Sequence, residues 1–201
     1  MKIVSRVGAV AIAALLLSAG CLAAASSSSS ATVASSTSSS SRVKVTITGG
    51  HATSAVDNGR PVVLVAAVLG VPPEVFREAF SHVTPAAAGE EPDPTQVGLN
   101  KEALLAVLAP YGVTNESLDR ASNYYRYNGS AGEMWPTVRA TAKAVVKNGR
   151  VTRVVITNPG AGYTSAPTIK ISGARDVTLT ATVRYTTRFA TNGSLSAINV
   201  S

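Results

Sequence analysis

The sequence predicts an α+β fold: a small helical bundle followed by an antiparallel β-hairpin and β-repeat module, after a cleaved signal and a disordered serine-rich linker. Three observations support this prediction. The middle of the 201-residue chain has apolar residues at helical spacing between prolines and glycines. The last third alternates apolar and polar residues around Asn-Gly and Pro-Gly pairs. An apolar leader and a run of serines precede both parts.

The first 20 residues have the layout of a secretory signal. Lys2 and Arg6 precede an apolar run from Val7 to Leu17, and the small residues Ser18 to Gly20 follow it. This run is too short to cross a bilayer as a helix. We expect residues 1–20 to be removed when the protein is exported.

Cys21, the only cysteine of the chain, directly follows this leader. Residues 1–21 resemble a bacterial lipoprotein signal, in which the cysteine becomes the lipidated first residue of the mature chain. The resemblance implies a membrane anchor of acyl chains such as palmitate on Cys21. Because Leu22 rather than Asp follows, it also implies the outer membrane or the cell surface. Ordinary signal cleavage, which leaves a free thiol, is the alternative. A lone cysteine excludes an intrachain disulfide.

Residues 21–41 form the predicted linker. From Ser26 to Ser41 the chain has 11 serines and two threonines, so it has almost nothing to pack. As a random coil these residues would reach about 20–25 Å. Such a spacer suits a folded body held by a lipid anchor.

The rest of the chain divides by charge into two predicted domains. Residues 42–136 have seven Lys and Arg against ten Asp and Glu, whereas residues 137–201 have nine against one. The first part is therefore net −3 and the second net +8. We expect a mainly helical domain over 42–136 and a basic β module over 137–201, whose charge favours an anionic partner.

The helical domain begins with one strand candidate and continues with four helices. Prolines open the first two helices, a glycine ends the first, a proline stops the third, and Thr114 or Asn115 caps the fourth. A proline-rich acidic loop over 84–94 separates the second helix from the third. The predicted strand is 43–48, and the predicted helices are 61–69, 73–83, about 101–109, and 114–125.

The basic module opens with a hairpin. Small or apolar residues occupy every second position over 138–146, and Asn148-Gly149 is a strong signal for a two-residue turn. A hairpin closed there places Val146 opposite Val151, and Ala142 opposite Val155. Arg153 falls on the apolar side, where we expect it to extend to a rim.

The other face of this hairpin is strongly basic. Four cations on one side of a hairpin do not belong to a core, so that side faces solvent or a ligand. We interpret it as a candidate anion-binding surface, with an anionic polysaccharide or another envelope polymer as its partner. The four residues are Arg139, Lys143, Lys147 and Arg150.

A second turn follows the hairpin. Pro159-Gly160 suits the centre of a type II turn, because proline fixes the first φ and glycine accepts the positive second one. Residues 157–173, with Gly162, Tyr163 and Pro167, resemble a glycine-tyrosine-proline β-repeat of bacterial surface proteins and of phage tail or virion proteins. The resemblance implies a structural or display module without catalytic residues.

Part of this module is repeated later in the chain. Asn192-Gly193 repeats Asn148-Gly149 at an offset of 44 residues, with apolar residues at matching positions after it. A hairpin from Val177 to Val200 would then complete the sheet. Repeats of this kind can also stack between copies, so self-association is a second function to consider.

No catalytic, metal or cofactor site is evident, so we expect a non-enzymatic protein that binds or organises surface polymers or partner proteins. A specific nucleic-acid ligand is not expected. The alternatives are a structural assembly subunit and an unrecognised hydrolase in the helical part, with His51 as its first candidate. Tyr124, Tyr125 and Tyr127, with Trp135, are expected to seal the join to the β module rather than to stack on a ligand.

Overall fold

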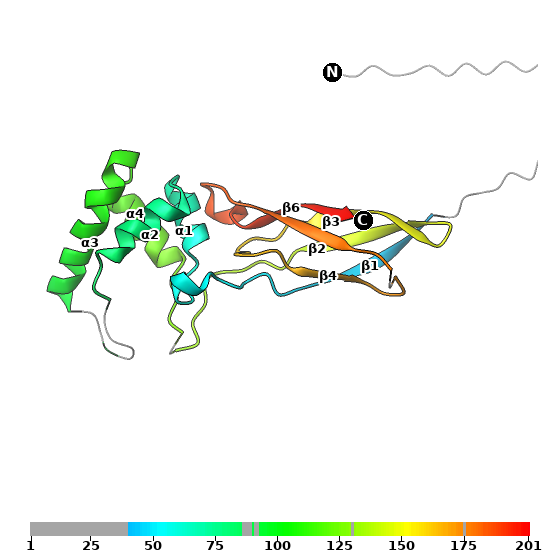
Figure 1. Cartoon of the computed structure of the whole chain (residues 1–201), viewed down its shortest axis with the longest axis horizontal. Helices are drawn as coiled ribbons and strands as arrows, with labels where there is room; N and C mark the ends of the chain where they lie inside the picture. The colour runs from blue at the N-terminus through cyan, green and yellow to red at the C-terminus, as the bar shows by residue number, and fades with distance from the viewer. Residues whose placement is uncertain (1–39, 86–89, 91–92, 130, 175) are drawn as a thin grey trace, which may run out of the picture. The chain divides into compact units, whose positions relative to one another are not determined.

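The computed structural model describes residues 40–85, 90, 93–129, 131–174 and 176–201, and it confirms the α+β class (Figure 1). The described residues all belong to one compact unit. The predicted signal, Cys21 and all but the end of the serine-rich linker lie outside them. The helices are α1 (Val62–Leu69), α2 (Pro73–Ser81), α3 (Pro94–Leu108) and α4 (Asn115–Tyr124). The strands are β1 (Ser40–Thr48), β2 (Thr141–Lys147), β3 (Arg150–Asn158), β4 (Thr168–Ile171), β5 (Leu179–Arg184) and β6 (Ser194–Val200).

Three helices begin and end close to where the sequence predicts. The α1 helix follows Pro61 and ends at Gly70, which has the positive φ of 72° that a left-handed cap requires. A proline at the first helical position opens α2. At α4, the Thr114 hydroxyl accepts from the Ser117 backbone N–H at 3.2 Å, and the Ser117 hydroxyl accepts from the Thr114 N–H. This reciprocal capping box fixes the start of the helix.

The third helix is longer than predicted, because it starts at Pro94 instead of near Lys101. The Asp93 carboxylate caps this earlier start by accepting from the Thr95 N–H at 2.8 Å. Gly98 in its interior has a low helix propensity, so the sequence does not indicate the first half of this helix. The end of the predicted loop is thus helical.

The helices enclose a core of their own. It is formed by buried apolar side chains from α1, α2, α3, α4 and the segments beside them, with Trp135 joining from beyond α4. The fully buried members include Leu64, Ala66, Ala79, Leu108 and Ala121. Burial of one face of each short helix supplies the stability that such helices lack in isolation.

Strand β1 belongs to the sheet, although it precedes all the helices. The four-stranded sheet is antiparallel with the order β3-β2-β1-β4, so β1 lies between β2 and β4. The strand starts at Ser40, so the last two residues of the predicted linker are part of it. The division predicted at residue 136 therefore differs from the structure at this element: the helices are an insertion between β1 and β2.

The first hairpin closes at Asn148-Gly149 as predicted, with φ values of 51° and 76°. Val146 pairs with Val151, in agreement with the prediction. Ala142, however, pairs with Ile156 and not with Val155. The cause is a β-bulge that leaves Thr152 without a partner on β2 and shifts the pairing of residues 153–156 by one residue. A second irregularity lies between Thr141 and Ala142.

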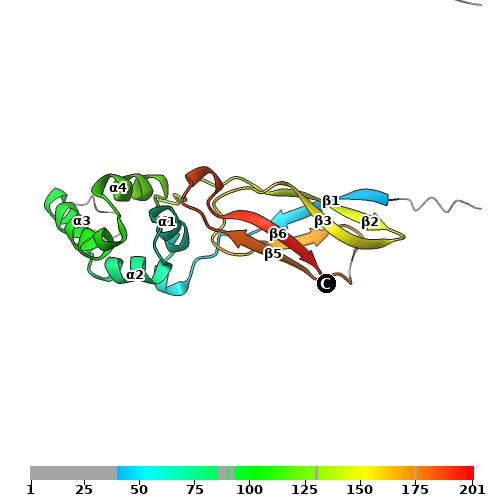
Figure 2. The same ribbon diagram turned by 90° about the horizontal axis from the view of Figure 1, so that it is seen from above.

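The second hairpin is formed by β5 and β6, but it makes a separate two-stranded sheet instead of completing the first (Figure 2). Asn192-Gly193 does not close it, because β5 and β6 are joined by residues 185–193. Asn192 has a φ of −71° and a ψ of 134°, unlike the positive φ of Asn148. The two Asn-Gly pairs therefore have different conformations.

A second core lies between the inner face of the four-stranded sheet and the β5–β6 hairpin. Every strand of the two sheets contributes to it, and the alternation of buried and exposed residues along β2 and β4 follows from this. Its buried members from the strands are Val45, Ile47, Ala142, Ala144, Ile169, Ile171, Ala181, Leu195 and Ile198. The opposite face of the four-stranded sheet faces solvent.

Candidate anion-binding face

The pairing register shows which residues share the outer face of the four-stranded sheet. Residues directly opposite each other in antiparallel strands point to the same side. On β2, Ala142 and Ala144 are buried, so Lys143 and Lys147 point outward. The residues paired with these two lysines must point outward as well.

This pairing gathers cations from strands that are distant in the sequence. Lys143 lies opposite Lys44 of β1, and Lys147 lies opposite Arg150 of β3. We call the resulting surface the cationic face, defined as the exposed outer residues Arg42, Lys44, Lys143, Lys147, Arg150, Arg153 and Lys170. These are all the Lys and Arg residues of β1 to β4, and those four strands contain no Asp or Glu.

The bulge at Thr152 adds Arg153 to this face. In an unbroken register Arg153 would point to the core, which is why the sequence predicts it on the apolar side. The extra residue reverses the alternation, so that Arg153 is exposed and pairs with Val145, whose other neighbour is Arg42. The prediction of an arginine extending to a rim was therefore wrong.

Arg139, the fourth cation predicted for this face, lies just before β2 and is exposed. Ala140 is buried, so the alternation of the strand places Arg139 on the same side as Lys143. It lines a hollow of about 260 Å³ together with His51 and Tyr163. Arg139 is thus adjacent to the cationic face but outside the paired strands.

The cations form short rows across the sheet. Partners on adjacent strands are about 5 Å apart, and successive rows along a strand are about 7 Å apart. An open hollow of about 760 Å³ lies among Arg42, Val145, Lys147, Thr152 and Arg153. Among the described residues, no acidic side chain lies within 4 Å of any cation of this face. The rows therefore offer uncompensated positive charge, which attracts anions.

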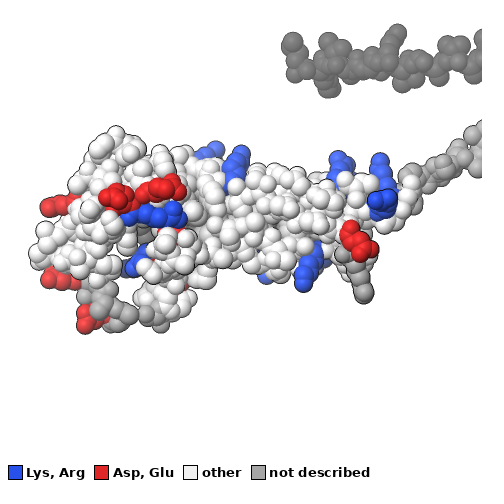
Figure 3. Space-filling model, in the orientation of Figure 1, with Lys and Arg blue, Asp and Glu red and all other residues white. Residues whose placement is uncertain are grey.

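Charge in the structure is more segregated than in the predicted domains. Once β1 is counted with the sheet, residues 49–136 have five Lys and Arg against ten Asp and Glu, a net charge of −5. On the face shown in Figure 3, Asp and Glu gather over the helices, and Lys and Arg predominate over the strands. The alternation of Arg42 and Lys44 with Val43 and Val45, at the start of the strand predicted over 43–48, was the signal that could have enlarged the candidate site.

The predicted turn motif has a structural role in this unit. Gly160 has a φ of 66°, and its N–H donates to the Asn158 side chain at 2.9 Å. The Tyr163 hydroxyl is buried and accepts from the Ala140 N–H at 2.9 Å. Pro167 is buried beside Gly50. Pro159 is exposed, and its carbonyl accepts from the Leu195 N–H at 2.9 Å. The motif thus holds the start of β2 and the second hairpin together.

His51 is packed against this motif. Its ring stacks on Tyr163 with 5.0 Å between the centroids, and its Nδ1 lies 3.3 Å from the Gly162 carbonyl. The hollow that it lines contains no acidic residue among those the structure describes. Among the described residues, the ring contacts a carbonyl and an aromatic face.

The aromatic residues after α4 pack between the helices and the second hairpin. Tyr125 is buried, and its ring and that of Tyr124 lie 5.9 and 4.6 Å from the ring of Phe189. Trp135 is buried and donates from Nε1 to the Gly162 carbonyl at 2.8 Å. Tyr127 lies 6.2 Å from the Trp135 ring. These contacts are those of the sealing role that the sequence predicts.

In the described part of the chain, no helix has the length and apolar character needed to cross a membrane. Comparison of the chain with protein-family models, with curated proteins and with solved structures finds no match.

Proposed function

We propose that this protein is a non-enzymatic lipoprotein of the cell envelope whose cationic face binds an anionic surface polymer. The observation that supports binding most directly is that all seven Lys and Arg of four adjacent strands share one solvent-exposed side without an acid among them. The buried inner face explains why these charges point outward, but it does not explain why none of them is an acid. The predicted leader and Cys21 support the location.

The partner class follows from the geometry of the charges. Lysine and arginine side chains from flat rows reach outward as separate donors, which suits a linear polymer with regularly spaced phosphates, sulfates or carboxylates. Strands β1 to β4 contain no aromatic residue, so this face of the sheet offers no aromatic platform for base stacking. We therefore favour an acidic polysaccharide or a teichoic-acid type polymer over nucleic acid.

Retention on heparin and on immobilised teichoic acid tests the binding. The triple variant Lys44→Gln, Lys143→Gln and Lys147→Gln should elute from both columns at clearly lower salt than the wild type. The matched control removes three exposed cations elsewhere, by Arg120→Gln, Arg184→Gln and Arg188→Gln, and has the same net charge. Equal elution of the two triple variants would reject the cationic face as the binding site.

The anchor has its own test. Mass spectrometry of the membrane fraction should find acyl chains on a mature chain that begins at Cys21. The Cys21→Ser variant should lose both the acyl mass and the membrane association. A full-length, unprocessed chain in the cytosol would overturn the proposal of export.

Assembly through the sheet is the alternative structural function. Strand β3 is an edge of the four-stranded sheet, and Val155 on it is 41% exposed. Arg150 and Arg153 on the same strand oppose edge-to-edge pairing by like-charge repulsion. A concentration-dependent dimer in sedimentation, lost in Val155→Lys, would favour assembly over polymer binding.

A further inference from the structure

A small pocket in the helical part is lined by two arginines and by aromatic side chains. Its volume is about 210 Å³. The main lining residues are Arg60, Phe76, Phe80, Tyr125, Arg126 and Tyr127. We call it the arginine pocket. It shares no residue with the cationic face.

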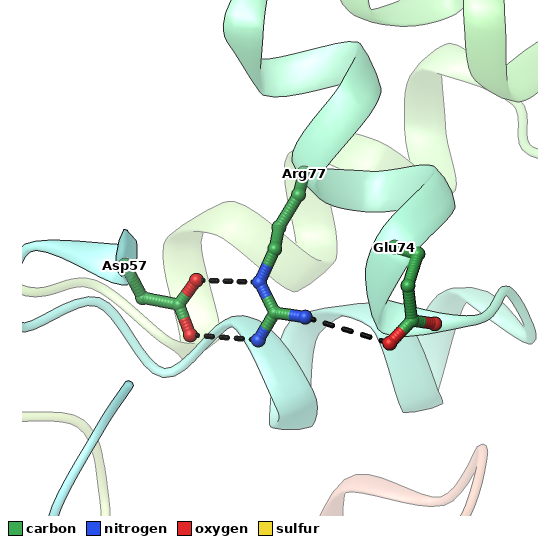
Figure 4. Close-up of polar contacts among 3 residues, drawn as sticks. All are labelled: Asp57, Glu74 and Arg77. Carbon is green, nitrogen blue, oxygen red and sulfur yellow. Dashed lines mark hydrogen bonds and ion pairs between the residues drawn. The ribbon is translucent and has the colours of Figure 1, made fainter. Parts of the chain in front are cut away.

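The two arginines differ from the other cations around them. Residues 49–136 contain five Lys and Arg, and three of them are paired with acids. Lys101 lies 2.8 Å from Asp119, and Arg120 lies 4.0 Å from Glu116. Arg77 binds Asp57 through two hydrogen bonds of 2.7 and 3.0 Å and lies 3.6 Å from Glu74 (Figure 4).

Arg60 and Arg126 have no such partner among the described residues, although acids outnumber bases two to one in this part of the chain. Both unpaired cations line the same pocket. A guanidinium beside an apolar wall gains most from an anion that binds both of its N–H groups, because the wall limits its hydration.

The structure holds one of these guanidiniums in place. The Arg60 backbone N–H donates to the Asp57 carbonyl at 2.9 Å, and the guanidinium lies 4.9 Å from the centre of the Phe80 ring. This cation–π contact places the guanidinium over an aromatic ring, and no described acid pairs with its N–H groups. Phe76 and Tyr125, both buried, also line the pocket and give an apolar surface for a flat group.

The size of the pocket limits the ligand. A closed apolar cavity of about 150 Å³ accepts one benzene molecule. The additional volume here fits a single carboxylate attached to the ring, and two of the residues that line the pocket are arginines that can bind it. Larger ligand sites usually begin at about 300 Å³, so this pocket suits a fragment and not a cofactor.

We propose that the arginine pocket binds a monocarboxylate attached to an aromatic or similarly bulky apolar group. The ring packs against Phe76, Phe80 and Tyr125, and the carboxylate accepts hydrogen bonds from Arg60 and Arg126. The group is either a free small acid or the C-terminal residue of a polypeptide, which share this chemistry. The inference does not depend on the function of the cationic face.

Titration of the full-length protein in detergent with benzoate, followed by NMR chemical shifts, tests this proposal. Benzoate has about nine non-hydrogen atoms, which predicts a Kd on the order of 1 mM. The shifts of the amide signals of Phe80 and Tyr127 should saturate. Benzamide has the same shape but no charge, and its affinity should be lower by a factor of about ten.

Arginine variants provide the controls. Arg60→Gln and Arg126→Gln should each weaken benzoate binding about tenfold, whereas Arg120→Gln, an exposed arginine on α4, should not change it. Arg126 is exposed, so its variant keeps the fold even if Arg60→Gln does not. Equal binding of benzamide and benzoate, or an equal loss in Arg120→Gln, would overturn the proposal.

The source of the carboxylate is distinguished with N-acetylphenylalanine. Tighter binding of this compound than of benzoate supports a polypeptide C-terminus as the ligand, and the reverse order supports a free acid. The triple variant of the cationic face should bind benzoate like the wild type. If neither benzoate nor N-acetylphenylalanine shows saturable binding, the proposed site is rejected.

Discussion

The side-chain amide of Asn192 donates a hydrogen bond of 2.8 Å to the backbone carbonyl of Leu64, which lies 128 residues earlier in the chain. The same amide group donates to the Tyr125 hydroxyl at 2.9 Å, and its oxygen accepts from the Thr186 N–H at 3.0 Å. Asn192 is fully buried. One side chain thus joins α1, the end of α4 and the β5–β6 connection, which makes the helical insertion and the strands one unit.

Asn192→Ala should therefore cost about 3 kcal/mol of unfolding free energy. The alanine cannot replace any of the three hydrogen bonds, and it leaves the buried Leu64 carbonyl without that partner. Urea denaturation followed by circular dichroism measures the change. Asn199→Ala on the exposed side of β6 is the control and should change stability by less than about 0.5 kcal/mol. A similar loss for both variants would contradict this role for Asn192.

The Asp57–Arg77 pair predicts a second large effect. The Asp57 side chain is 3% exposed, and its hydrogen bond is the main cause that raises the pKa of Arg77. Removal of one partner leaves a buried charge uncompensated, so Arg77→Gln should destabilise the fold by about 3 kcal/mol. Arg77→Lys should be intermediate, because lysine retains the charge but not the two-pronged geometry.

Thermal and urea unfolding of Arg77→Gln should be compared with Arg120→Gln. Arg120 lies 4.0 Å from Glu116 on the exposed surface, where an ion pair contributes well under 1 kcal/mol. If both variants unfold at the same urea concentration, the buried Asp57–Arg77 pair does not stabilise the fold more than an exposed ion pair does.

Much of the fold could be predicted from local signals. Prolines, glycines and capping residues gave the positions of α1, α2 and α4, and Asn148-Gly149 gave the first hairpin, because each signal acts within a few residues. The start of α3 was missed, since Gly98 obscures a helix that Asp93 caps. The strand at 43–48 was recognised as a strand, but local alternation does not reveal its partners.

The candidate site shows the same limit. Lys143, Lys147 and Arg150 lie on one side of the hairpin as predicted, because alternation along each strand suffices for that, whereas Arg139 lies just before the paired residues. Arg42 and Lys44 were missed because their neighbours are about 100 residues away. Arg153 was misplaced because nothing in the sequence marks the bulge at Thr152. The arginine pocket depends on tertiary packing and leaves no pattern in the sequence.

Gly162→Ala should destabilise the turn motif far more than Gly149→Ala. Both glycines have a positive φ, of 82° and 76°, so the backbone penalty of an alanine is similar, about 1 kcal/mol. A Cβ at Gly162 would lie 2.6 Å from the Pro136 carbonyl oxygen and 3.1 Å from the Thr137 Cα, whereas at Gly149 it would meet open space.

The difference between the two glycine variants therefore isolates the close backbone approach. We expect Gly162→Ala to lose about 2 kcal/mol more than Gly149→Ala in urea denaturation. Tryptophan fluorescence should also change in Gly162→Ala alone, because the Trp135 indole donates to the Gly162 carbonyl. Equal losses of unfolding free energy in the two variants would show that the backbone around Gly162 can shift at little cost and that this close approach does not hold the motif together.

The buried hydroxyl of Tyr125 predicts a loss of stability at high pH. Burial raises the pKa of Tyr125 to about 12, with a smaller opposing effect of the hydrogen bond from Asn192. An unfolded tyrosine has a pKa of about 10, so the native state retains this proton where the unfolded state loses it. The contribution is fully present below pH 10 and is lost as the pH rises from about 10 through about 12.

Over that window the unfolding free energy should fall by up to about 1.4 kcal/mol per pH unit because of Tyr125. Tyr125→Phe cannot ionise there, so its stability should decline less steeply above pH 10, and the two curves should converge. Burial also raises the pKa of Tyr185, which serves as an internal reference. Absorbance at 295 nm should show one fewer late-titrating phenol in Tyr125→Phe. Parallel stability curves from pH 10 to 12 would mean that this hydroxyl ionises as readily in the folded protein as in the unfolded chain.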